Sequence, residues 1–137
     1  MKQLVLLLLV VLVVSSACSS GESSIGGSGL PAQQPGETYQ GPRMAISGEV
    51  RLASNGCVST VVDGSPLFTI WPQGSEWSGE AVALSDGAEI RPGDTISATG
   101  AAVAVEALPG WPDGRWGNDV GYCDPDARSV LVIDEVG

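Results

Sequence analysis

Apolar and polar residues alternate with a period of two in the part of the chain that follows its N-terminal third. Between positions 46 and 52, apolar residues and one glycine share one parity, while charged and polar residues share the other. This pattern predicts a half-buried strand. Asn55-Gly56 comes next and is a strong hairpin signal, so 57–62 is the expected return strand. Residues 67–71 are apolar on both faces and predict a central strand.

The second half of the domain continues the strand pattern with one irregularity. A short strand is predicted at 80–84, and turn residues follow it. The segment 95–105 is longer, and the parity of its apolar residues changes around Gly100, which favours a β-bulge. Residues 107–127 are rich in Gly, Pro and Asp and predict a loop, and 129–136 predict the closing strand. No helical spacing of apolar residues appears in this part of the chain.

Five to six short strands, one of them bent at a glycine, predict an all-β domain built as a small Greek-key barrel. Residues 91–100 read RPGDTISATG. They are similar to the Gly-Asp-x-hydrophobic start of a strand that is common in oligonucleotide/oligosaccharide-binding (OB) folds, and this resemblance implies an OB-like barrel. The alternative is an immunoglobulin-like β-sandwich, because Cys57, Trp71 and Cys123 have roughly the Cys…Trp…Cys spacing of that family.

The first eighteen residues have the pattern of an export signal. Lys2 precedes an apolar run of eleven residues, Leu4 to Val14, and the small residues Ser15-Ser16-Ala17 lead to Cys18. The run is too short to cross a bilayer, which takes about 20 helical residues, so residues 1–17 are predicted to be a signal peptide that is removed.

The residues Ser16-Ala17-Cys18 resemble the lipobox of bacterial lipoproteins. Ser15 departs from that pattern, since the family usually carries Leu, Val or Ile there. The resemblance implies that Cys18 is lipidated, becomes the new N-terminus and anchors the protein to the extracytoplasmic face of a cell membrane. Residues 18–43 are mostly Ser, Gly, Pro and Gln, which predicts a disordered tether. Residues 44–137 then form the barrel domain.

Charge and composition exclude several classes of function. Removal of residues 1–17 takes away the only lysine, so the formal net charge changes from −10 to −11. An acidic chain of this kind is not expected to bind nucleic acid, nor to be held by charge on anionic lipid. The chain contains no histidine, which removes the usual imidazole base and metal ligand. We expect no enzyme activity, no catalytic residue, no metal and no cofactor.

Two cysteines remain after Cys18. An even pair in an exported chain predicts a disulfide between Cys57 and Cys123. A closed loop of this length would stabilise the fold by roughly 4 kcal/mol in the chain-entropy model. A reactive thiol is the alternative, but the chain offers no histidine to lower its pKa.

All four tryptophans lie in two similar segments, 71–77 and 111–116, and each segment begins Trp-Pro-x-Gly. Indole rings in loops suit stacking on sugars or apolar ligands. Polar neighbours that could hydrogen-bond hydroxyl groups are Glu76, Asp113, Arg115 and Asn118. The candidate ligand-binding residues are therefore Trp77 and Trp116, predicted to line one groove, with Trp71 and Trp111 as further candidates. Packing in the core is the simpler interpretation, most of all for Trp71 and Trp111.

The acidic loop 113–126 could in principle hold a calcium ion through oxygen ligands. The regular Asp-x-Asx-x-Asx-Gly spacing is absent, however, and Asp-Gly and Asp-Pro are ordinary turn residues. The function predicted is that of a non-catalytic binding or interaction domain, an accessory module of a cell-envelope assembly with a protein partner. The alternative is a module that binds glycan or a small solute through its loop tryptophans.

Overall fold

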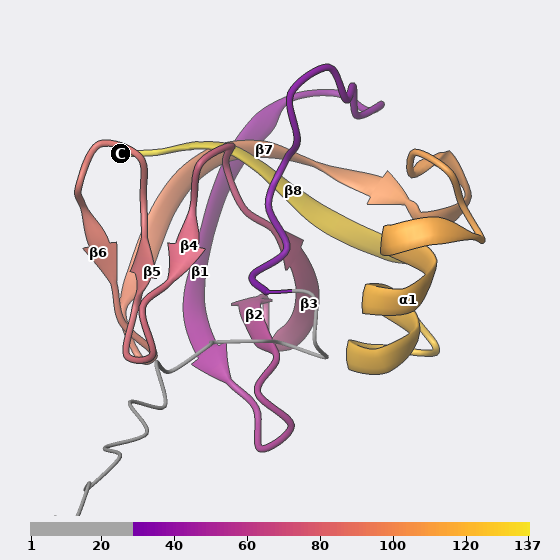
Figure 1. Cartoon of the computed structure of the whole chain (residues 1–137). Coiled ribbons are helices and arrows are strands. Elements are labelled where there is room, and N and C mark those ends of the chain that lie inside the picture. The colour runs from indigo at the N-terminus through magenta and orange to yellow at the C-terminus, as the bar shows by residue number, and fades with distance from the viewer. Residues whose placement is uncertain (1–28) are drawn as a thin grey trace, which may run out of the picture.

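The structure is a computed structural model, which describes residues 29–137. The predicted signal peptide and Cys18 lie outside the described residues. Five strands form a closed barrel in the order β1-β2-β3-β8-β7 (Figure 1). They are β1 (Met44–Leu52), β2 (Val58–Val62), β3 (Ser65–Ile70), β7 (Thr95–Ala104) and β8 (Ser129–Val136). The predicted OB-like Greek-key barrel is therefore confirmed, and the alternative β-sandwich is wrong.

Strand β1 belongs to two pairings, which meet at Glu49. Its first half pairs with β7 and its second half with β2, all antiparallel. The barrel closes through a parallel pairing of β3 with β8. Gly48 lies near the changeover, where a Cβ atom would come within 2.6 Å of Thr60 Cγ2 and 2.8 Å of the Val61 carbonyl oxygen. Only glycine fits this close approach of two strands.

The predicted irregularity at Gly100 is confirmed as a shift in register between Thr99 and Gly100 of β7. Before the shift, Ile96 and Ala98 are buried in the core cluster that includes Ile46 and Ile133. After the shift, alternate residues from Ala101 onward are buried in a second cluster together with the helix. At the shift Asp134 of β8 has no partner in β7, and the buried face of β7 changes at the same place.

A small second sheet follows β3. It consists of β4 (Glu76–Trp77), β5 (Val82–Ala83) and β6 (Glu89–Ile90), so the strand predicted at 80–84 is reduced to two residues. Val82 and Ile90 are buried in the first core cluster, which attaches this sheet to the barrel.

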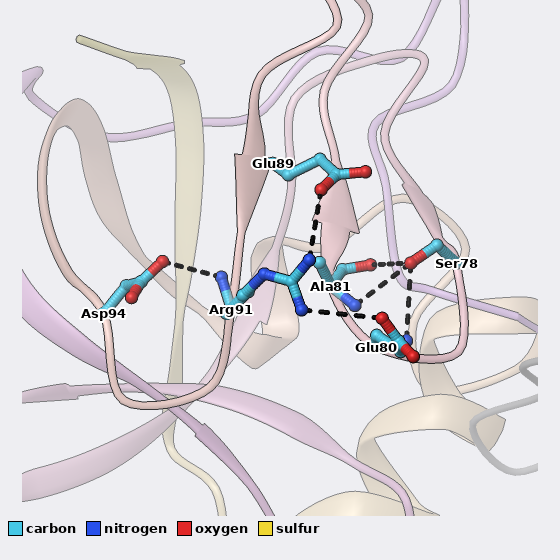
Figure 2. Close-up of polar contacts among 6 residues, drawn as sticks. All are labelled: Ser78, Glu80, Ala81, Glu89, Arg91 and Asp94. Atoms are coloured by element: carbon cyan, nitrogen blue, oxygen red, sulfur yellow. Dashed lines mark hydrogen bonds and ion pairs between the residues drawn. The ribbon is translucent and has the colours of Figure 1, made fainter.

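Polar contacts on the outside of this sheet are drawn in Figure 2. The Arg91 guanidinium lies 3.5 Å from Oε2 of Glu80 and 3.6 Å from Oε2 of Glu89. The backbone N–H of Arg91 donates to Oδ2 of Asp94. All three charged side chains of the ion pairs are more than half exposed. Exposed pairs contribute little to stability, so the buried Val and Ile side chains hold this sheet in place.

The prediction of a loop over residues 107–127 is wrong in part. A short 3-10 helix covers Val105–Ala107, and an α-helix, α1, spans Gly114–Cys123. Three glycines and several polar residues hide this helix in the sequence, because glycine has low helix propensity. Its buried residues are Trp116, Asp119 and Val120, a spacing of three and four that places them on one face. Packing of that face against the barrel stabilises the helix.

The predicted tether also ends earlier than expected, because residues 29–39 lie on the barrel. We call this segment the strap; Figure 1 shows it in indigo, crossing one side of the barrel before β1. Leu30, Ala32 and Tyr39 are buried. The backbone N–H of Trp71 donates to the Pro31 carbonyl at 2.9 Å, and the backbone N–H of Gln33 donates to the Trp71 carbonyl at 2.9 Å. The strap therefore satisfies backbone groups at the end of β3, which composition alone could not show.

The predicted disulfide between Cys57 and Cys123 is confirmed, with Cα atoms 5.8 Å apart. It joins the start of β2 to the last residue of α1, two places that are separated by 66 positions in the chain. Among the described residues, no helix is long and apolar enough to cross a membrane.

Candidate functional site

A cleft of about 550 Å³ lies on the described part of the chain. One wall is the strap, the opposite wall is the turn that leads from β3 into β4, and Arg115 of α1 completes the lining. The cleft thus joins three segments that are far apart in the sequence. Its members are Gly29, Leu30, Ala32, Gln33, Gln34, Pro35, Gln73, Gly74, Ser75, Glu76, Trp77 and Arg115.

The structure does not bring the predicted tryptophans together in one groove. Trp71 and Trp116 have exposed fractions of 0% and 1%, so neither can present a ring face to a ligand. Trp111 is half-buried and packs against the second core cluster. Trp77 is half-buried and is the one tryptophan that lines the cleft. The groove predicted between Trp77 and Trp116 is therefore not formed.

Trp116 instead holds the far end of the strap. Its ring lies edge-on to Tyr39, with centroids 6.3 Å apart, and its indole N–H donates to Glu37 Oε2 at 3.2 Å. The Tyr39 hydroxyl donates to the other oxygen of Glu37, also at 3.2 Å. Burial, and then the adjacent Glu37 carboxylate, raise the pKa of the Tyr39 hydroxyl above its ordinary range. Tyr39 therefore stays protonated and keeps this hydrogen bond at neutral pH.

Arg115 holds the near end of the strap. Its guanidinium donates to the Ala32 carbonyl at 3.3 Å and to the Leu30 carbonyl at 3.2 Å. Its Nε lies 3.5 Å from Oδ2 of Asp119, a side chain with only 3% exposure. It also stacks over the Trp116 ring, 4.7 Å from the centroid. The planar fork of arginine suits this double carbonyl contact, so the residue acts as a clamp on the cleft wall.

The remaining polar groups of the cleft are mainly amides. Gln33 is held by the barrel, since its Nε2 donates to the Ile133 carbonyl at 2.7 Å. Gln73 and Glu76 are exposed, and neither side chain makes a hydrogen bond with another described residue. The Ser75 hydroxyl is buried in the same wall and has no partner within residues 29–137. The cleft therefore contains several donors and acceptors that are not used by the fold.

The other predicted polar residues serve different purposes. Asp113 precedes α1 at its N-terminal end, and Asp119 pairs with Arg115. In the described range, no group of three His, Cys, Asp or Glu side chains lies close enough to hold a metal ion. Asp124 lines a smaller hollow of about 280 Å³ beside the disulfide, with Arg51 and Phe68.

Part of the cleft could be found in the sequence and part could not. Glu76, Trp77 and Arg115 stand in or beside the Trp-Pro-x-Gly segments that drew attention to this chemistry. The strap residues were missed because they lie in a stretch with the composition of a tether. The only local signal was the small apolar group Leu30-Pro31-Ala32 directly before the two glutamines.

No family model, no curated protein and no solved structure matches this chain. The function of the candidate site is therefore inferred from its residues and their geometry.

Proposed function

We propose that this chain is an exported lipoprotein, anchored through Cys18 to the extracytoplasmic face of a cell membrane. Its barrel is a non-catalytic binding domain and serves as an accessory module of a cell-envelope assembly. The signal-like residues 1–17 and the lipobox-like Ser16-Ala17-Cys18 support the anchor.

The docked strap is the observation that carries this proposal. Only residues 19–29, eleven in number, separate Cys18 from Leu30, the first strap residue buried in the core. At 3.3–3.6 Å per residue this length of chain spans at most about 40 Å. An anchored domain would thus stay near the membrane surface, and the cleft, which Gly29 and Leu30 line, would lie where the chain arrives from the anchor.

The chemistry of the cleft supports binding rather than catalysis. Its described lining contains a single carboxylate, that of Glu76, whereas hydrolysis of glycosides normally needs a facing pair. No histidine exists in the chain to act as a base for a serine. The other polar side chains of the lining, apart from Trp77, are amides, the buried Ser75 hydroxyl and the Arg115 guanidinium, which already donates to the strap carbonyls.

Fractionation of cells that express the full chain tests the anchor. The native protein should partition with membranes and incorporate a labelled fatty acid, whereas Cys18→Ala should appear in the soluble fraction or as an uncleaved precursor. Ser19→Ala is the matched control and should behave as the native chain. A Cys18→Ala protein that is fully processed and still membrane-bound would show that the anchor proposal is wrong.

In-cell crosslinking of the tagged native chain, followed by mass spectrometry, tests the role in an assembly. We expect a reproducible envelope protein that is lost from the Cys18→Ala sample, since only the anchored domain stays at the membrane. The same protein in the Ser19→Ala sample is the control. A blank in the native sample would contradict the proposed assembly role.

A further inference from the structure

The unused hydrogen-bonding groups of the cleft limit the chemistry of its ligand. The side chains of Gln73 and Glu76 on one wall make no hydrogen bond with another described residue, whereas the Nε2 groups of Gln33 and Gln34 in the strap already donate to the Ile133 and Ala32 carbonyls. A side-chain amide both donates and accepts, so it can pair with a hydroxyl group in either direction. A ligand with many hydroxyl groups satisfies such a lining, whereas a hydrocarbon would leave these groups without partners.

Trp77 supplies the apolar surface in this polar cleft. It is half-buried at the end of β4 and lines the cleft together with its neighbour Glu76. A flat indole beside hydrogen-bonding groups suits a ring that has an apolar face and polar edges. The ring of a pyranose sugar has this character.

The electrostatics of the cleft disfavour a charged ligand. The Arg115 guanidinium is directed to the carbonyls of Leu30 and Ala32 and to Asp119, so its charge is already paired. Glu76 is the single carboxylate of the lining and would repel an anion. One exposed carboxylate is also a weak site for a cation, because water screens it.

We infer that this cleft binds a neutral saccharide, with one sugar ring against the Trp77 indole and its hydroxyl groups hydrogen-bonded to Gln73 and Glu76. The inference rests on the proposed non-catalytic binding function and names its ligand class. Arg115 is a positioning residue, which holds the strap wall through the carbonyls of Leu30 and Ala32.

Calorimetric titration of the exported protein with four tetrasaccharides tests the inference. Two are neutral, chitotetraose and maltotetraose; the others are the cationic tetramer of glucosamine and the anionic tetramer of galacturonic acid. We expect a neutral tetrasaccharide to bind at least about tenfold more tightly than either charged one. Tighter binding of a charged tetramer, or no binding of any of the four at 10 mM, the chosen upper concentration (about −2.7 kcal/mol), would overturn it.

Matched variants locate the binding. Trp77→Ala and Gln73→Ala should each weaken binding of the neutral sugar by roughly tenfold or more. The controls are Tyr122→Ala, an exposed aromatic residue outside the cleft, and Gln40→Ala, an exposed glutamine beyond the strap. Gln73 is exposed, so its variant keeps the test valid if Trp77→Ala does not fold. Equal affinity in the native protein and Gln73→Ala would contradict the assigned site.

Failure of this inference is distinct from failure of the proposed function. If no saccharide binds while membrane attachment still depends on Cys18, only the ligand class is rejected. If a saccharide binds but Cys18→Ala stays processed and membrane-bound, the anchor is rejected and the cleft remains.

Discussion

At the scale of single residues, a few glycines determine how closely the elements approach. A Cβ atom on Gly100 would overlap the Val132 carbonyl oxygen and lie 2.9 Å from Ile46 Cδ1. A Cβ atom on Gly117 of α1 would overlap the Pro112 carbonyl oxygen. In both places the neighbour is backbone, which cannot move aside as a flexible side chain can. Only glycine fits at these two positions, because there is no room for a Cβ atom.

Gly100→Ala should lower the free energy of unfolding by about 3 kcal/mol or more, because β7 or β8 must shift to admit the methyl group. Urea denaturation of the exported protein measures this change. Gly121→Ala is the control, since nothing lies within 4 Å of its Cβ position in α1. That control should stabilise the protein by about 0.5–1 kcal/mol through helix propensity. Equal stability of Gly100→Ala and the native protein would disprove the close approach.

At the scale of elements, the strap and α1 depend on each other. The strap has one backbone pairing, Ala32 with Trp71, and α1 has glycines where strong helix formers would be expected. Arg115 and Trp116 of α1 hold the strap at its two ends, through Leu30 and Glu37 respectively. Neither segment has a strong intrinsic preference for its conformation, so packing between them provides the stability.

Arg115→Lys should loosen the strap, because an ammonium group cannot reproduce the fork that donates to two carbonyls. Charge-assisted hydrogen bonds contribute about 1.5–3 kcal/mol each. Their loss should therefore speed hydrogen exchange of the Gln33 and Trp71 amides by at least roughly tenfold. The readout is amide exchange by NMR or mass spectrometry. Arg128→Lys, an exposed arginine outside these contacts, should leave the exchange rates unchanged. Slow exchange in Arg115→Lys would show that Arg115 does not clamp the strap.

At the scale of the whole molecule, one covalent link connects the barrel with its helix. The Cys57–Cys123 disulfide ties the start of β2 to the end of α1. Trp116 and Val120 of the helix belong to the second core cluster. Arg115 and Trp116 of the same helix donate hydrogen bonds to Leu30 and Glu37 of the strap. Loss of the disulfide is therefore expected to affect the helix, the strap and the cleft together.

The double variant Cys57→Ala/Cys123→Ala should lose about 4 kcal/mol of stability, the chain-entropy value for a loop of this length. Its urea midpoint, compared with that of the native protein with and without reductant, measures the change. Reduced native protein should unfold at nearly the midpoint of the double variant. A midpoint that reductant does not alter would mean that the bond is absent or contributes nothing.

Local patterns were sufficient for the barrel strands, the bulge and the disulfide pair. Alternating residues near β1, the change of parity at Gly100 and an even pair of cysteines each report a constraint that acts within a few residues or on residue type alone. The Trp-Pro-x-Gly segments pointed to Trp77 and to its neighbour Glu76. They also pointed to Trp116, which the structure buries.

By itself, the sequence determined the all-β class of the domain, the position of its bend and the residues able to form a disulfide, because strand periodicity and turn residues are local properties. Only the tertiary structure decided that the strap docks, that α1 is a helix and that a cleft forms beside Trp77. Each of these depends on contacts between distant segments, such as Arg115 with Leu30 and Ala32. Such contacts leave no periodic pattern in the sequence, and burial is what stabilises them.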